Sequence, residues 1–216
     1  MSKSFNFLSA PKIHFLYPKA VLSCFCAVAL LSCASCGRQQ PTERAEANKA
    51  LTGSSRLFGV PGELVGHANQ FGFRATPYAP DGGSFLSIGG PITLSQSDAA
   101  APNTGRFEAA GTTVGQLDRV AFTLAITDPA NADTAKQRFA DVVRGVLFHY
   151  GIEDAAGVAA IVAEQAGDRS VAGIPASLAV TPGEGDTRTI IVTFTRPAAS
   201  TPGNQQAQGQ ANGNRA

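Results

Sequence analysis

The segment from about Arg119 to Thr127 constrains the fold more than any other part of the sequence, because its residues alternate in size. Large apolar residues stand at every second position, namely Val120, Phe122, Leu124 and Ile126, with small residues between them, namely Ala121, Thr123, Ala125 and Thr127. Successive side chains of a β-strand point to opposite faces of the sheet. The alternation therefore predicts a strand that is buried on one face only.

The same pattern returns near the C-terminus. There Ile190, Val192 and Phe194 share one face, and Thr189, Thr193 and Thr195 share the other with Ile191. One apolar face and one face of small residues are typical of an antiparallel sheet with a single covered side. We expect the small-residue face to be in contact with water; the alternative is a flat surface that receives a partner.

Helices are predicted to cover the apolar face. Asp128 and Pro129 are suited to the N-cap and first position of a helix, and Gly151 is suited to its end. Between them, apolar residues follow one stripe at helical spacing, namely Ala135, Phe139, Val142, Val143, Val146 and Tyr150. A second helix is expected over about 153–166, ended by Gly167, with its alanines facing the first helix.

Shorter elements are expected before and after this core. They are a helix over 61–71 ended by Gly72, strands over 71–76, 84–88, 91–95 and 106–110, a turn over 80–83 and a hairpin tip over 183–186. The fold class that follows is α+β: a two-layer sandwich of a mainly antiparallel sheet with a helix pair on one face.

The N-terminal segment has the layout of an export signal. Residues 1–32 contain Lys3, Lys12 and Lys19 but no acidic residue, and an uncharged, mostly apolar stretch fills 20–32. A basic region followed by a short apolar core is typical of secretory signal peptides. The apolar stretch is shorter than the roughly 20 residues that a transmembrane helix needs.

The apolar core ends in Leu30-Leu31-Ser32-Cys33. This sequence resembles the lipobox of bacterial lipoproteins, in which an aliphatic residue, a variable residue and a small residue precede an invariant cysteine. The resemblance implies that Cys33 becomes the first residue of the mature protein. Its thiol would carry a diacylglyceryl group, and its new amino group would be acylated, so that the protein meets the membrane through covalent lipid. The alternatives are an uncleaved signal anchor and ordinary secretion after cleavage.

The resemblance also bears on location. Residue 34, directly after the lipidated position, is Ala34. In enteric-type lipoproteins an Asp at this position retains the protein in the inner membrane. The resemblance therefore implies the outer membrane, facing the periplasm, rather than the inner membrane.

All cysteines precede Gly37; they are Cys24, Cys26, Cys33 and Cys36. The rest of the chain therefore has neither a disulfide framework nor a cysteine-ligated zinc site. No metal site is expected at the cysteines themselves, because cleavage would remove one pair and lipidation would split the other. We predict no cofactor.

Four regions are predicted along the chain: a signal peptide over 1–32, the lipidated Cys33 with a polar tether over 33–56, a single α+β domain over 57–196, and a disordered tail over 197–216. The tail is rich in Gln, Asn, Gly and Ala. Such a composition cannot bury enough apolar surface to offset the entropy of ordering.

Residues for catalysis are scarce in the predicted domain. Glu63 and His67 are one helical turn apart, which is half a metal site at most, and we interpret them as a surface pair. His149 is interpreted as a partly buried structural histidine. Asp128, Asp133 and Asp141 are interpreted as capping and solvent-facing residues. No catalytic residue is predicted, although enzymatic activity is left open.

One large aromatic residue stands apart from the apolar stripe of the long helix. Phe148 is on the same side of that helix as Gln137, Asp141 and Arg144. We expect the N-terminal segment to cover it; the alternative is exposure to a partner.

The sequence favours a lipid-anchored envelope protein whose body is a non-enzymatic binding or scaffolding module for an envelope protein partner. An envelope hydrolase acting on the cell wall and a carrier of an apolar ligand are the alternatives. Net charge is only +1, with 17 basic and 16 acidic residues and no basic stripe, so nucleic acid is not an expected partner.

Overall fold

The computed structural model describes residues 51–96 and 100–198. The predicted signal peptide over 1–32, Cys33 and most of the predicted tether lie outside these residues, and so does the predicted tail beyond 198. Within the described part, no helix is long and apolar enough to cross a membrane.

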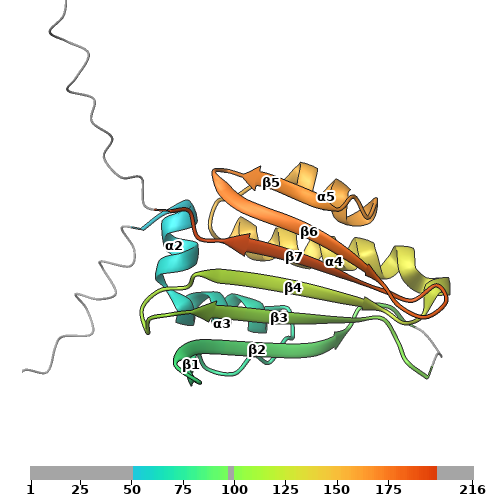
Figure 1. Ribbon diagram of the computed structural model, residues 1–216, viewed down its shortest axis with the longest axis horizontal. Coiled ribbons are helices and arrows are strands. Elements are labelled where there is room, and N and C mark those ends of the chain that lie inside the picture. Colours follow the sequence, from blue (N-terminus) through green and yellow to red (C-terminus); the bar gives the residue numbers. More distant parts are fainter. Residues whose placement is uncertain (1–50, 97–99, 199–216) are drawn as a thin grey trace, which may run out of the picture. The chain divides into compact units, whose positions relative to one another are not determined.

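A seven-stranded, wholly antiparallel open sheet forms one layer of the body, in the order β1-β2-β3-β4-β7-β6-β5 (Figure 1). The strands are β1 Ala79–Asp81, β2 Ser84–Thr93, β3 Thr104–Gly111, β4 Arg119–Ile126, β5 Gly167–Val171, β6 Ile174–Pro182 and β7 Arg188–Thr195. The helices are α2 Gly53–Gly59, α3 Pro61–Gln70, α4 Ala132–Phe148 and α5 Ala155–Val162, with a 3-10 turn η1 at Pro129–Asn131. The predicted α+β class and antiparallel sheet are confirmed.

The two alternating segments of the sequence form neighbouring strands at the centre of the sheet. Phe122 of β4 is opposite Val192 of β7, and Leu124 is opposite Ile190. All four of these side chains are buried, as the alternation predicts. Figure 1 shows α3 and α4 behind the sheet, so the described helices leave the small-residue face uncovered.

The helix layer contains one helix more than the predicted pair. Helices α4 and α5 pack against each other, as predicted, and α4 packs on β4. Gly157 and Ile161 of α5 border a small cavity together with residues of β6 and β7. The helix that was not expected in this layer is α3, which comes before the sheet in sequence and contacts β2 and β3. The start of α4 also differs. Pro129–Asn131 is a 3-10 turn, and Asp128, at its N-cap position, makes no capping hydrogen bond through its side chain. Instead, the Asp128 carboxylate accepts a hydrogen bond from Asn131 Nδ2 at 2.7 Å.

Helix α5 ends earlier than the predicted helix over 153–166, because the backbone leaves the helical conformation at Glu164. Glu164 has a left-handed backbone, with φ of 55°, which a helix cannot continue through. Its carboxylate accepts from Arg188 Nε at 2.6 Å and from Lys136 Nζ at 3.0 Å. The Arg188 guanidinium lowers the pKa of Glu164 below its usual value, although burial acts in the opposite direction. This network joins α4, the end of α5 and β7.

Other predicted elements are wrong or incomplete. The segment 71–76 is not a strand: Gly72 and Arg74 have φ of 89° and 51°, and it meets β2 through separate hydrogen bonds, Gly90 N to Phe73 O and Thr76 N to Ile88 O. The predicted pieces 84–88 and 91–95 join in one strand, β2, across an irregularity near Gly89.

The described body contains two elements that were not predicted, and its two ends lie close to each other. Helix α2 was not predicted, and it begins the folded body before residue 57, with Leu57 and Phe58 buried. The hairpin of β5 and β6, closed by Ala172 and Gly173 with φ of 49° and 81°, was also not predicted. Leu51 and Pro197 line the same hollow of about 330 Å³, so the chain enters and leaves the body at one place.

Three phenylalanines form the centre of the core between α3 and the sheet. The ring centroids of Phe73, Phe107 and Phe122 lie 5.5 to 6.2 Å apart in tilted pairs. Tilted rings at such distances attract one another beyond the burial of their area. The cluster ties the non-strand segment after α3 to β3 and β4.

We expect Phe122→Ala to lower the free energy of unfolding by about 3–5 kcal/mol, since it removes a fully buried ring and leaves a cavity. Urea denaturation of the purified protein measures this change. Phe148→Ala is the matched control: this ring is 69% exposed, and its loss should change stability by less than about 0.5 kcal/mol. Equal losses in the two variants would contradict the proposed position of the core.

Candidate functional site

Helix α3 lies between two candidate sites. One stripe of the helix is buried, and the flank on each side of this stripe borders one of the sites. Leu64 and Ala68 are completely buried on the stripe. At helical spacing, Gly62, Gly66 and Asn69 follow one flank, and Glu63 and His67 follow the other. The helix begins at Pro61 and ends at Gln70. Shortly after its end, Gly72 has a left-handed backbone with φ of 89°.

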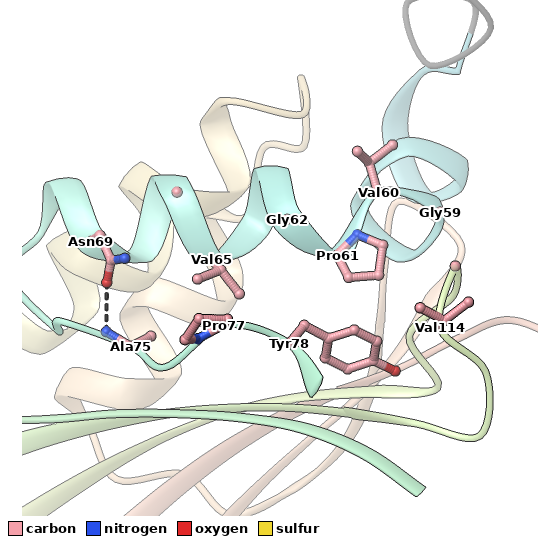
Figure 2. A pocket seen from close by; sticks show the side chains of 12 residues that line it. Gly59, Val60, Pro61, Gly62, Val65, Asn69, Ala75, Pro77, Tyr78 and Val114 are labelled. Atoms are coloured by element: carbon pink, nitrogen blue, oxygen red, sulfur yellow. Dashed lines mark hydrogen bonds between the residues drawn. The ribbon is translucent and has the colours of Figure 1, made fainter. Parts of the chain in front are cut away.

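A groove of about 630 Å³ runs along the glycine flank of α3 (Figure 2). Its other walls are the segment 75–78 and the tip of the β3–β4 connection at 114–115. Its lining contains no charged side chain; it consists of Gly59, Val60, Pro61, Gly62, Val65, Gly66, Asn69, Ala75, Pro77, Tyr78, Val114 and Gly115. Its size falls within the range of ligand-binding pockets.

Two hydrogen-bonded side chains hold the walls of the groove in place. Asn69 Oδ1 accepts from the backbone N–H of Ala75 at 2.6 Å, which joins α3 to the opposite wall (Figure 2). The Tyr78 hydroxyl lies 3.0 Å from Gln116 O and 3.2 Å from Thr113 O and donates its single proton to them. Burial, followed by the negative charge of Asp118, raises the pKa of Tyr78. The polar groups of the groove are therefore neutral and fixed.

Glycine leaves one wall of the groove open. A Cβ atom added at Gly62 or at Gly66 would have no atom within 4 Å. Glycine inside a helix costs roughly 0.5–1 kcal/mol relative to alanine, and packing within the described residues does not require it here. The bare backbone of α3 thus lets a bound group approach the helix closely.

The opposite flank of α3 carries a cluster of ionisable side chains. Glu63 Oε1 lies 3.2 Å from His67 Nε2, and Arg56 Nη2 lies 2.6 Å from the same oxygen. The rings of His67 and His149 stack with centroids 3.9 Å apart and planes within 8°. Tyr150 meets the His67 ring edge-on at 5.6 Å. The cluster thus joins α2, α3 and the end of α4.

The electrostatics of this cluster favour the neutral form of the His149 imidazole at the end of α4. Desolvation, followed by the charges of His67 and Arg56, lowers the pKa of His149, while Glu63 acts to raise it. Burial is also the main cause that raises the pKa of Tyr150. The Tyr150 hydroxyl and His67 Nδ1 have no hydrogen-bond partner among the described residues.

The structure brings together some of the residues that the sequence singled out. Glu63 and His67 contact each other, as their spacing predicts. His149 joins them, which the sequence did not predict, and it is exposed rather than partly buried. Neither histidine lines the groove. In the described ranges, no group of three or more His, Cys, Asp or Glu residues could hold a metal ion.

Two further predictions concern the surface. Asp133 pairs with Lys136 and Asp141 with Arg144, consistent with their interpretation as solvent-facing residues of α4. Phe148 is 69% exposed, so the residues of 51–96 and 100–198 do not supply the expected cover. The segment predicted to supply it lies outside them.

The groove could not be recognised from the sequence, because its walls come from separate stretches of the chain. The available signal was weak: glycines spaced four residues apart in a helix whose other residues are amphipathic. No known protein family matches the sequence, and neither a curated protein nor a solved structure matches the chain. The candidate site therefore depends on its own geometry.

We expect the pKa of His149 to lie below the usual value of 6.5, because partial desolvation beside the stacked His67 ring and the neighbouring positive charges oppose protonation. The unfolded chain then binds more protons than the folded one, so stability falls as the pH is lowered through about 6.5. NMR titration of the His149 ring protons measures the pKa directly. His67→Asn should move that pKa upward, and a His149 titration at or above 6.5 in the parent would contradict the stacked arrangement.

Proposed function

We propose that the protein is a lipid-anchored component of the bacterial cell envelope whose body is a non-enzymatic binding or scaffolding module. The lipobox-like Leu30-Leu31-Ser32-Cys33 supports the anchor. Two or more acyl chains hold a protein stably on a bilayer. Ala34 favours the outer membrane, with the body facing the periplasm.

The uncharged groove beside α3 is the observation that carries the binding role. Its fixed walls, apolar side chains and neutral polar groups suit an uncharged, narrow segment of a partner protein. A charged ligand would lose its hydration there without gaining an opposite charge. The groove is open to solvent and not an enclosed cavity, which suits a chain segment better than an enclosed apolar ligand and so favours a binding module over a carrier.

A hydrolase acting on the cell wall is the second candidate, and the Glu63–His67 hydrogen bond is the observation that favours it. A carboxylate bonded to an imidazole orients that ring for proton transfer. Both side chains, however, lie on the flank of α3 opposite the groove. If the protein is a hydrolase, His67→Ala should abolish release of cell-wall fragments by the purified protein; the binding role predicts no release by either the variant or the parent.

Cys33→Ser tests the anchor. We expect this variant to leave the membrane fraction and to keep its leader, because only a thiol can form the thioether that precedes cleavage. Fractionation of cells and a mass spectrum of the N-terminal peptide measure both effects. Cys36→Ser is the matched control and should be anchored and processed as the parent is. Cys33→Ser protein that remains in the membrane fraction and loses its leader as the parent does would contradict the proposal.

Gly66→Leu tests the groove. A Cβ atom at residue 66 would have no atom within 4 Å, and we expect the rest of the leucine side chain to occupy the groove that Gly66 lines. Leucine should also stabilise α3 by about 0.8 kcal/mol relative to glycine. Full-length protein carrying photoreactive p-benzoylphenylalanine at Val114, on the groove wall, is irradiated in living cells. We expect a crosslinked partner that Gly66→Leu reduces about tenfold or more.

Gln70→Leu places the same side chain on the same helix but outside the groove. It should leave the crosslink unchanged. A crosslink that is insensitive to Gly66→Leu, or that both variants lose equally, would show that the groove does not bind the partner. Thermal melting of each variant separates loss of binding from loss of fold.

A further inference from the structure

The exposed Phe148 interrupts a polar face of α4. Its side of the helix carries Gln137, Asp141 and Arg144 at preceding helical turns, and the ring itself is 69% exposed. Isolated exposed apolar residues are common on protein surfaces. Phe148 differs because it borders a cleft.

This cleft, of about 450 Å³, lies between the end of α4 and the start of α5. Its lining consists of Arg144, Phe148, Ile152, Glu153, Asp154, Ala155 and Val158. The apolar part of the lining includes Ala155, which is exposed, and Val158, which is half-buried. A cation and two acidic residues border the same small apolar surface.

The charges of the cleft are available to a partner. The Arg144 side chain is 57% exposed, and it contacts the Asp141 carboxylate at 2.8 Å through Nη2. Its remaining guanidinium donors have no partner among the described residues. Glu153 is exposed and has no ion pair within the described ranges, whereas Asp154 Oδ1 accepts a hydrogen bond from Gly157 N at 2.7 Å.

We propose that this cleft is a self-association surface and that its occupant is a second copy of the same chain, related by a two-fold axis. Phe148 of each copy enters the cleft of the other, against Ala155 and Val158. Arg144 of one copy faces Glu153 of the other, and the symmetry forms this ion pair twice. An isologous contact requires a patch that is complementary to itself.

Charge complementarity favours a second copy over an unrelated partner. A uniformly acidic or basic partner would meet a like charge on one side of the cleft, which opposes binding. The patch is small, and interfaces below about 1,200 Å² are typical of weak or transient association. The lipid anchor proposed above would compensate by confining the copies to one surface, which raises their effective concentration.

Photocrosslinking of the full-length protein in cells tests the proposal. Position 148 is exposed and aromatic, so it accepts p-benzoylphenylalanine in place of Phe148. We expect a product of twice the monomer mass, with the attachment mapped by mass spectrometry to residues 144–158 of the other copy. The same probe at Gln137, which is nearer the start of α4 and does not line the cleft, should give no such product.

Charge reversal supplies the specific readout. Arg144→Glu and Glu153→Arg each convert both symmetric ion pairs into like-charge contacts, and each should lower the yield of the dimer product about tenfold. The double variant exchanges the two charges and should restore the yield. Arg138→Glu, an exposed arginine of α4 outside the cleft, is the matched control and should have no effect.

Three outcomes would overturn the proposal: a probe at 148 that attaches only to another protein, no dimer product, or a double variant that does not regain the yield. The membrane fraction is measured in the same cells. If the protein is absent from the membrane fraction but still gives the dimer product that depends on the charges at 144 and 153, the result contradicts the proposed location and not the self-association.

Discussion

The burial of one stripe of α3 is the constraint on which the rest of the arrangement depends. Leu64 and Ala68 are fully removed from water, and the helix contacts β2, β3 and α4. At its C-terminal end, the ring of Phe71 occupies the space where a side chain at Gly145 of α4 would lie. A larger residue at that position would displace the Phe71 ring. The rotation of α3 about its own axis is therefore fixed, and with it the direction in which each flank points.

This fixed rotation keeps two kinds of chemistry apart. One flank presents bare backbone and neutral groups to the groove, while the other holds Glu63 and His67 in contact with Arg56 and His149. A proton that binds to His149 changes the charge of the cluster on the second flank, but it places no charge in the groove. A binding surface built in this way depends on shape and on apolar contact, and its affinity should respond little to the ionic strength of the surroundings.

The parts of the fold that the sequence predicts are those whose pattern is local. The alternation around Phe122 and the apolar stripe around Phe139 identify the central strands and α4, because burial on one face imposes a regular period. The segment containing Phe73 also alternates, yet the left-handed backbone at Arg74 prevents a strand. The contact of Glu63 with His67 follows from helical spacing. The stacking of His149 on His67, like the groove, depends on how separate helices pack, and no local pattern encodes it.

The two ends of the described chain meet at one hollow, which Leu51 and Pro197 both line. When the two ends of a folded body lie close together, they can be joined, or attached to another chain, without moving the strands apart. The body could therefore be inserted as a unit into a loop of another protein, or reopened at the 183–186 hairpin with its original ends joined, without breaking any pairing between strands. Architectures of this kind are readily transplanted between different chains, which gives an evolving genome a simple way to combine this body with other domains.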